Sequence, residues 1–541
     1  MKRFSIILGA LSLFIIGASS CKKSFLDEKP YSSYSPSSVT DSLGLEASLV
    51  GLYQYQTGTL TYSPQQGWPS VWQVGTDVAN ATANQQGIEV PYYNYAQLTS
   101  TDAAAAIAWS RNYALINNAN IILDGLKSAT GIGPVGKRLV EAEAKFFRGY
   151  AYNTLATLYG RVPIILTSVT GPKLDFTRAT LDEVNNQIVS DLTFSAANLP
   201  DLNAGNGRVN SVNKPVSRAN RYMAMQLLAE VYLRSGKNDL AEQQAQAVIS
   251  SGKFNLIRSR YGVRSSGAGD YYSDMFVYGN QRRYQGNSEA IWVIEQENPT
   301  LVPGGSVDAA QQRRVFTPAY YAIPGMLPVD SLGGRGVGRL RLSNWVLYQL
   351  YKGNDIRNSQ YSIKRRYYYN DPAPAYASLY GKPVPFAGAD TLFRICPATL
   401  KWGAFDPNDT FGFAMIKDFI VMRLGETYLL LAEAQFKQGK IADAVNSINV
   451  LRTRANAPQA TAADMSLNLI LDERARELIA EENRRMTLMR TGTLVTRSLA
   501  LNGNDPQKPT TGLTSTHLLL PIPLSEIQLN KDARLEQNPG Y

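Results

Sequence analysis

Apolar residues recur at intervals of three or four positions through the first half of the chain, from Ser42 to about Ser251. Residues with this spacing lie on one side of an α-helix, so the pattern predicts a series of amphipathic helices. Clusters of Gly and Pro at 64–67, 131–136 and 160–163 predict where these helices end. Three apolar faces are clear: Leu45, Leu49, Leu52 and Tyr53; Ile107, Tyr113, Ile116 and Ile121; and Ala142, Phe146, Tyr150 and Leu155.

Two segments share one pattern of small and apolar residues. Each reads as a helix, a Gly turn and a second helix with small residues where the helices cross, which is typical of tetratricopeptide (TPR) repeats. Because the two copies lie about 200 residues apart, we expect a helical solenoid interrupted by a large insertion. The matching positions are Leu228, Ala229, Glu230, Gly236, Ala241, Ala245 and Val248 in one copy, and Leu431, Ala432, Glu433, Gly439, Ala444, Ile448 and Leu451 in the other.

The insertion, from about Arg258 to Phe411, is rich in Gly, Tyr, Pro and Arg. Within it, the run from Glu289 to Gln296 predicts a buried strand, and we expect Trp292 to lie in the core. Most of the remainder is expected to form loops. Loops of this length in a compact protein are usually functional or disordered, and the aromatic content favours ordered loops.

Residues 467–490 are expected to form one charged helix. Asp472 and Arg476, and likewise Glu481 and Arg485, lie four positions apart and have opposite charges. Such pairs stabilise a helix surface, so the simplest interpretation is a solvent-exposed, salt-bridged face.

The N-terminus has the three parts of an export signal. Lys2 and Arg3 precede a short apolar run at residues 4–16, and small residues at 17–20 lead to Cys21. The apolar run is shorter than the roughly 20 residues that a membrane-spanning helix requires.

We interpret residues 1–20 as a lipoprotein signal peptide, Cys21 as the lipidated residue and residues 21–41 as a tether. One departure from the lipoprotein pattern is Ala18, where Leu is commoner. The alternative is an ordinary secretory signal. Lipidation would anchor an otherwise water-soluble body to a membrane.

The composition disfavours several classes of catalytic and metal site. The chain has 541 residues, of which 44% are hydrophobic, so it can bury a sizeable core. His517 is the one histidine, which disfavours a Ser-His-Asp hydrolase and a multi-histidine zinc site. If Cys21 carries lipid, only Cys396 remains, and no disulfide can form within the chain. The formal charge of +10 favours anionic ligands weakly, and scattered surface lysines and arginines explain it equally well.

We expect no metal and no cofactor. Three oxygen-bearing residues lie close together in the insertion, but their spacing is not that of an EF-hand calcium loop. They are Asp406, Asn408 and Asp409.

An ordered set of motifs along the mature chain resembles the SusD/RagB family of outer-membrane nutrient-binding lipoproteins. One departure from the family pattern is Glu482, where the family usually has Gly. The matching motifs are Phe25–Asp27 with Pro30, Trp109 with Tyr113, Ile116 and Asn120, Glu141–Arg148, Leu158–Pro163, Asp355–Arg357, Met422–Ala434, Arg452 and Arg454, Glu473–Arg484, Pro521–Pro523 and Gln537–Tyr541.

The resemblance implies a mainly α fold: a TPR-like helical body with four TPR-like units, and an irregular second lobe with a few short strands. We assign residues 42–257 and 412–500 to the body, and residues 258–411 and 501–541 to the second lobe. The resemblance also implies a partner, a SusC-type TonB-dependent outer-membrane barrel, over which the lipoprotein acts as a hinged lid. Such a lid delivers oligosaccharides, or in some members peptides, at the cell surface.

Sugars present C–H faces and a rim of hydroxyls, so a binding site needs flat aromatic rings and planar hydrogen-bonding groups. In the first cluster below, Trp72 and the tyrosines would stack on sugar rings, while Asp77 and Asn80 would bind hydroxyls. The alternative is that Trp68 and Trp72 only pack a loop against a helix. The expected ligand residues are Trp68, Trp72, Asp77, Asn80, Tyr92, Tyr93 and Tyr95, and, on the opposing lobe, Tyr278, Tyr284, Tyr320 and Tyr321 with Arg282, Arg283, Arg313 and Arg314.

Two other functions stay open. A helical glycoside hydrolase would need two carboxylates about 5 to 9 Å apart. A TPR scaffold lipoprotein would bind only protein and would tolerate loss of Trp72. Arg357 and the basic and aromatic run at 364–369 could in principle bind nucleic acid, but on an exported lipoprotein we expect none.

Overall fold

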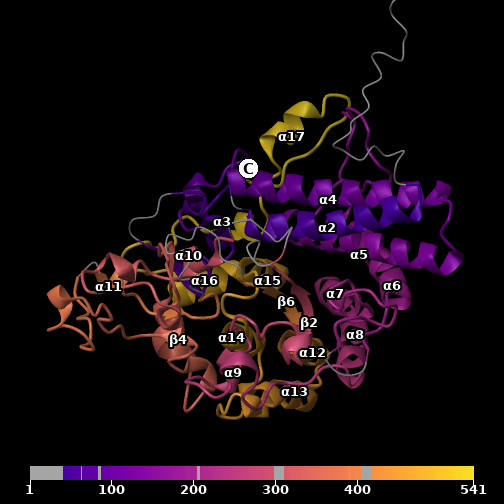
Figure 1. Ribbon diagram of the computed structural model, residues 1–541. Coiled ribbons are helices and arrows are strands. Elements are labelled where there is room, and N and C mark those ends of the chain that lie inside the picture. Colours follow the sequence, from indigo (N-terminus) through magenta and orange to yellow (C-terminus); the bar gives the residue numbers. More distant parts are fainter. Residues whose placement is uncertain are drawn as a thin grey trace, which may run out of the picture.

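The computed structural model describes residues 40–541 except 63, 83–86, 204–206, 298–301, 303–309, 389 and 404–416. Cys21 and the signal segment lie outside these residues. The fold is mainly α, with a few short strands, as the sequence predicts (Figure 1). No helix in the described ranges is both long and apolar enough to cross a membrane.

Long helices form one side of the molecule (Figure 1). The Asp41 carboxylate accepts a hydrogen bond from Gly44 N at 2.7 Å, and that of Asp102 accepts one from Ala105 N at 2.8 Å. These side chains satisfy backbone N–H groups that have no partner within a first helical turn. The predicted apolar faces pack against the core: Leu45, Leu49 and Leu52 are buried, and Ile107, Tyr113 and Ile121 are partly buried against it. The helices are α2 (Ser42–Thr61), α4 (Ala103–Ser128), α5 (Pro134–Tyr159) and α6 (Leu181–Asn198).

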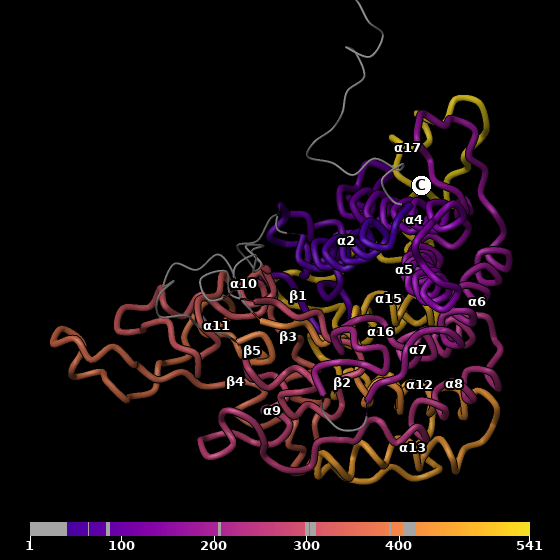
Figure 2. Tube along the Cα trace, turned by 45° about the vertical axis from the view of Figure 1, so that its right-hand side comes forward, coloured from indigo at the N-terminus to yellow at the C-terminus, as the bar shows by residue number. Residues whose placement is uncertain are grey.

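The two predicted helix–turn–helix copies form and lie side by side. Their turns are made by Gly236 and Gly439, whose φ angles of 72° and 76° are in the left-handed region that glycine adopts without strain. Helix α12 packs on α8, so the second copy continues the stack of the first (Figure 2). The copies are α7 (Arg221–Arg234) with α8 (Asn238–Ser250), and α12 (Leu424–Lys437) with α13 (Ile441–Arg454).

Short antiparallel strand pairs and brief helices form in and near the insertion, and those at 68–71, 79–81 and 419–423 lie outside it. The predicted buried strand is confirmed as β2, where Trp292 is 1% exposed and contacts the ring of Phe146. The pairs are β1 (Ala79–Ala81) with β3 (Leu340–Leu342), β2 (Ala290–Ile294) with β6 (Phe419–Arg423), and β4 (Ile363–Lys364) with β5 (Ala398–Thr399). The brief helices are α3 (Trp68–Val71), α9 (Tyr271–Asp274), α10 (Gln312–Phe316) and α11 (Asp390–Phe393).

The single charged helix expected at 467–490 is wrong. Two helices form, α14 (Leu467–Leu478) and α15 (Arg484–Arg490), separated by a turn in which Ala480 has a φ of 63°. The expected exposed face is also wrong, because distant elements supply the charge partners. Asp472 pairs with Arg497 at 2.6 Å, and Arg485 is buried.

The C-terminal segment, assigned above to the second lobe, packs on the long helices of the body. Leu520 N donates to Leu158 O at 2.7 Å, and Leu524 N donates to Ser100 O at 2.8 Å. Helix α16 (Leu494–Asn502) ends where this segment begins, and the segment's own helix, α17 (Leu524–Leu529), lies beside α4 (Figure 1).

Candidate ligand-binding site

A partly open cavity of about 260 Å³ lies among the elements of the helical body and is bordered by Gln312, Phe316 and Trp402 of the insertion. Helices α2, α3, α4, α5 and α7 line one side of it. The other side is lined by α10, β6, α12, the turn between α14 and α15, and Trp402. We call this space the interlobe cavity. Its aromatic lining residues are Trp68, Trp72, Tyr150, Phe316, Trp402 and Phe419.

Trp68 and Trp72 flank the short helix α3, whose first turn contains Pro69. The indole Nε1 of Trp68 donates to Thr59 O at 2.9 Å, which fixes this ring against α2. The ring of Trp72 meets it edge to face, with centroids 5.0 Å apart. Because Trp72 is only partly buried, its ring can present a flat surface to a ligand.

The facing wall is also aromatic and is held by hydrogen bonding. Trp402 Nε1 donates to Ala480 O at 2.8 Å, and its ring lies 5.0 Å from that of Phe419. These contacts bring a residue of the insertion against the turn that follows α14. Aromatic rings from separate parts of the chain therefore line both sides of the interlobe cavity.

Polar groups lie between the aromatic walls. Gln226 Nε2 donates to the Glu426 carboxylate at 2.9 Å, and Arg474 donates to the same carboxylate at 2.8 Å. Among the described residues, Arg474 Nη1 and Gln312 Oε1 are buried side-chain atoms with no hydrogen-bond partner. Buried polar atoms are normally satisfied, so one donor and one acceptor remain for a ligand.

Arginines hold the acidic side chains of the cavity. Burial raises the pKa of Glu426, and Arg474 only partly offsets it. Burial opposes ionisation of Glu482 too, but Arg474 and then Arg484 lower its pKa below the usual range. Glu481 pairs with Arg423 at 2.7 Å. These carboxylates are thus fixed acceptors within an ionic framework.

Asp77 does not bind ligand hydroxyls in this arrangement. It is fully buried, and its carboxylate accepts from Arg484 Nε at 2.8 Å, Arg484 Nη2 at 2.6 Å and Arg497 Nε at 2.9 Å. Burial opposes its ionisation, but Arg484 and Arg497 lower the pKa of Asp77 overall. The expected role is corrected to a structural one, because both carboxylate oxygens are already engaged.

Burial removes most of the other residues of the first cluster from a ligand surface. Asn80 donates to Asn502 at 2.7 Å and to Asp505 at 2.9 Å. Tyr92 donates to Asp102 at 2.8 Å, and the Tyr95 hydroxyl accepts from Arg485. Tyr93 is 7% exposed and packs into the main core.

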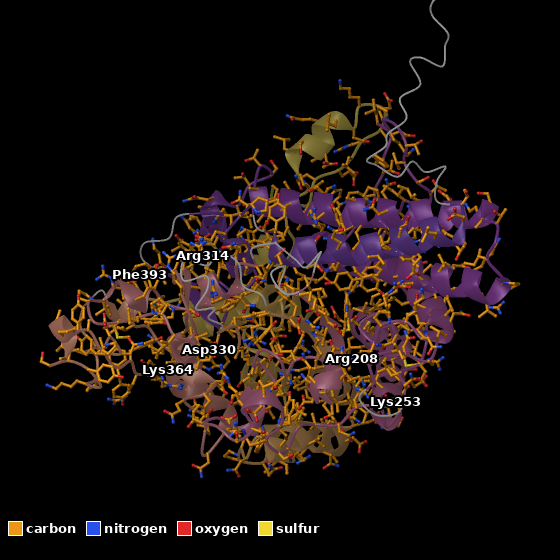
Figure 3. The ribbon with its side chains drawn as sticks, in the orientation of Figure 1. Arg208, Lys253, Arg314, Asp330, Lys364 and Phe393 are labelled. Atoms are coloured by element: carbon orange, nitrogen blue, oxygen red, sulfur yellow. The ribbon has the colours of Figure 1, made fainter. Side chains whose placement is uncertain are left out.

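The tyrosines expected on the opposing lobe lie apart from the interlobe cavity. Tyr320 is completely buried and stacks on Tyr367. Tyr284 and Tyr321 are partly exposed, and the guanidinium of Arg208 lies 4.5 Å from the centre of the Tyr284 ring. Arg208 is labelled in Figure 3. Tyr278 is 47% exposed on the surface.

Of the expected ligand residues, Trp68 and Trp72 are the ones that line the interlobe cavity within the described chain. The sequence analysis missed the other contributors because they come from separate elements without a shared local motif. For these residues, the signal available in the sequence was Trp402, a large aromatic residue within the loop-rich insertion. The missed residues include Tyr150, Gln226, Gln312, Trp402, Phe419 and Arg474.

Two further sequence expectations bear on the chemistry. In the part of the chain that the structure describes, His, Cys, Asp and Glu side chains do not gather in threes that could hold a metal. The suggested group at 406–409 lies outside the described residues. Cys396 is buried, and burial raises the pKa of its thiol to about 12.

Sequence comparisons find two families. A sequence model described as "SusD family" matches residues 414–541, and one described as "Starch-binding associating with outer membrane" matches residues 24–233. "SusD-like protein P25" of Formosa agariphila is 24% identical over 540 residues, which cover 95% of each chain. "Starch-binding protein SusD" of Bacteroides thetaiotaomicron is 38% identical over 124 residues, which cover 23% of this chain and 22% of the relative.

Solved structures share the fold. A laminarin-binding SusD-like protein superimposes with a TM-score of 0.67 at 23% identity, covering 93% of this chain and 100% of the other. Surface glycan-binding protein A from Bacteroides thetaiotaomicron, in complex with laminarihexaose, gives a TM-score of 0.69 at 19% identity, covering 92% and 100%.

Proposed function

The chain belongs to the SusD/RagB family, and we propose that it captures oligosaccharides at the cell surface and delivers them to a SusC-like TonB-dependent outer-membrane transporter. The observation that carries the proposal is the interlobe cavity. Its aromatic walls enclose an unpartnered acceptor, Gln312 Oε1, and an unpartnered donor, Arg474 Nη1. A sugar ring stacks on aromatic side chains, and its hydroxyls bond to hydrogen-bond acceptors and donors.

The cavity suits capture by stacking and hydrogen bonding. The C–H face of a sugar ring would lie on Trp72, where aromatic contact adds about 0.5–1.5 kcal/mol beyond the burial of area. Gln312 would accept from one hydroxyl and Arg474 would donate to another, each adding about 0.5–1.5 kcal/mol net. None of these contacts breaks a glycosidic bond.

The ligand class that we propose is a neutral oligosaccharide. One relative is named a starch-binding protein, and one solved structure with this fold holds laminarihexaose. Maltohexaose and laminarihexaose are therefore the first probes. The neutral amide of Gln312 and the charge-paired Arg474 suit hydroxyls better than a free anionic group.

The proposed location is the outer membrane, through lipid on Cys21. The described chain begins at Thr40, whose carbonyl accepts from Thr130 N at 2.9 Å just beyond the end of α4. A tether at residues 21–41 would thus join the body at this end of α4. We expect Cys21→Ser protein to appear in the soluble fraction, as judged by fractionation and acyl labelling. Continued acylation of that variant would contradict the assignment.

Calorimetric titration of the mature protein with maltohexaose and laminarihexaose tests the proposed function. We expect binding of at least one of them, and at least tenfold weaker binding by Trp72→Ala. The matched control is Tyr348→Ala, which removes a ring that is 69% exposed and outside the interlobe cavity. We expect this control to bind as the unmodified protein does.

Two outcomes would favour the other functions. Analysis of the sugars after prolonged incubation should show no shorter products, and turnover that a single carboxylate substitution abolishes would indicate a glycoside hydrolase. Absence of binding to a broad glycan panel, with Trp72→Ala indistinguishable from the unmodified protein, would favour a scaffold that binds only protein.

A further inference from the structure

A second cavity, of about 230 Å³, lies on another face of helix α4 from the interlobe cavity. Ala108 and Asn112 of α4 line the interlobe cavity, whereas Trp109 and Tyr113 line the second one. Residues between Pro163 and Phe176 and Glu526 of the C-terminal helix α17 also line it. We call it the α4–α17 pocket.

Three aromatic side chains shape the α4–α17 pocket: Trp109, Tyr113 and Phe176. The rings of Trp109 and Tyr113 are tilted toward each other, with centroids 4.8 Å apart. Tyr113 is held in place because its hydroxyl donates to Pro163 O at 2.9 Å. Phe176 is only partly buried, so its ring borders the opening.

One carboxylate, Glu526 in the first turn of α17, lines the same pocket. Among the described residues, no lysine or arginine pairs with it. The nearby Arg178 instead donates to the carbonyl oxygens of Arg161 and Glu536 and to the side chain of Asn538. Within the described chain the carboxylate therefore has no ion-pair partner, and the nearby ammonium of Lys173 instead lies 5.3 Å from the centre of the Phe176 ring.

We propose that the α4–α17 pocket binds an organic ammonium group, with Glu526 as its counter-ion and the faces of Trp109, Tyr113 and Phe176 around the cation. Aromatic faces attract cations through the ring quadrupole, and they tolerate the apolar methyl or methylene groups that an ammonium carries. Desolvation by the pocket adds to this attraction because it removes the competing water.

The acidic lining of the site agrees with a small cation. The pocket, of about 230 Å³, is similar in volume to the interlobe cavity, so the unpaired Glu526 rather than the volume indicates a cation. Burial raises the pKa of Glu526, with Trp109 partly offsetting the rise through a hydrogen bond. A bound cation would favour the charged form of this carboxylate and so oppose the rise in its pKa.

Choline and its uncharged isostere 3,3-dimethylbutan-1-ol are the probes for this site. In titrations of the mature protein followed by tryptophan fluorescence and calorimetry, we expect choline to bind at least tenfold more tightly than the alcohol. Its affinity should fall as the pH drops through the raised pKa of Glu526, at a pH above that of an exposed glutamate. The unmodified protein alone gives both readouts.

Two variants locate the site. We expect Glu526→Gln to remove the preference for choline over the alcohol, and Phe176→Ala to weaken choline binding. The matched control Glu536→Gln changes a carboxylate that is outside the pocket, with a 48% exposed side chain, and should keep the preference. Equal affinity for the two probes, no choline binding by the folded protein, or an unchanged preference in Glu526→Gln would each overturn the proposal.

Discussion

Trp72 and Asp77 lie five positions apart in the sequence but have different roles in the folded chain. Trp72 keeps part of its ring accessible at the interlobe cavity, whereas Asp77 is buried against Arg484 and Arg497. At the scale of single residues, burial and partners decide which members of an aromatic and polar cluster can meet a ligand.

We predict that Asp77→Asn lowers the free energy of unfolding by about 3–5 kcal/mol, because it removes one of the carboxylate partners of each of two buried guanidinium groups. Urea unfolding measures the loss. The exposed Asp532→Asn serves as the control and should change the value by less than about 0.5 kcal/mol. Glycan affinity of folded Asp77→Asn should stay within twofold of the unmodified protein. A stable variant that no longer binds glycan would contradict the structural role.

The sequence could indicate the tryptophans at 68 and 72 as candidate ligand residues, since an aromatic cluster in a loop region is visible locally, and both line the interlobe cavity. The sequence could not predict that both carboxylate oxygens of Asp77 would be paired with arginines. Its partners lie about 400 positions away, and their approach depends on the tertiary structure.

At the scale of elements, periodicity predicted most of the helical body. Helices α2 and α4 end, and α5 begins and ends, near the expected Gly and Pro clusters, and the expected turns at Gly236 and Gly439 separate the helices of each pair. The break between α14 and α15 was missed because the residue with positive φ is Ala480, which gives no local signal of a turn. In the insertion, β2 was predicted but the pairing of the strands was not, since β2 and β3 pair with segments far away in the sequence.

An ion pair links two elements of the body that are distant in sequence. Glu433 of α12 accepts from Arg490 of α15 at 2.8 and 2.7 Å. Burial opposes ionisation, but Arg490 and then Lys437 lower the pKa of Glu433 to about 2. Since the pKa in the folded state is below that of an unfolded glutamate, about 4.3, this group stabilises the fold above that pH. The contribution is lost as the pH falls toward 2.

We predict that Glu433→Gln lowers the free energy of unfolding at pH 7 by about 3–5 kcal/mol and makes it less dependent on pH between 5 and 2. Urea midpoints across this range measure both effects. Glu242→Gln is the control, because the Glu242–Lys440 pair also joins two helices but is partly exposed, and its loss should cost less than about 1 kcal/mol. Parallel pH profiles for Glu433→Gln and the unmodified protein would contradict the pairing.

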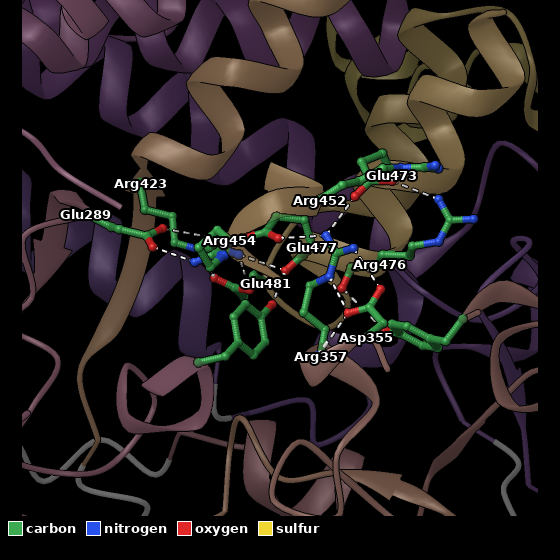
Figure 4. Close-up of polar contacts among 12 residues, drawn as sticks. Glu289, Asp355, Arg357, Arg423, Arg452, Arg454, Glu473, Arg476, Glu477 and Glu481 are labelled. Atoms are coloured by element: carbon green, nitrogen blue, oxygen red, sulfur yellow. Dashed lines mark hydrogen bonds and ion pairs between the residues drawn. The ribbon is translucent and has the colours of Figure 1, made fainter. Parts of the chain in front are cut away.

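At the scale of the whole molecule, a buried ionic network joins the insertion to the C-terminal helices (Figure 4). Arg357 binds Glu473 at 2.8 Å and Glu477 at 3.0 Å, both on α14. Glu289, just before β2, binds Arg423 at 3.2 Å and Arg454 at 2.5 Å. These side chains are at most 1% exposed, so each buried charge requires its oppositely charged partners. The network therefore fixes the position of the insertion relative to the C-terminal helices.

We predict that Arg357→Met lowers the free energy of unfolding by about 3–5 kcal/mol and exposes the insertion to protease before the helical body. Limited proteolysis followed by mass spectrometry identifies the first cleavage sites. Arg366→Met, an exposed position in the same insertion, is the control and should leave the digestion rate unchanged. If the first cleavages in Arg357→Met were confined to the helical body, this would contradict the role of Arg357 in holding the insertion to the C-terminal helices.

The most direct test of the account is a crystal structure of the protein with the hexasaccharide that binds most tightly. We predict sugar rings in the interlobe cavity, one of them within about 4 Å of the face of Trp72, with hydroxyls bonded to Gln312 and Arg474. An empty cavity, with sugar seen only at surface rings such as the exposed Tyr368 and Tyr380, would contradict it.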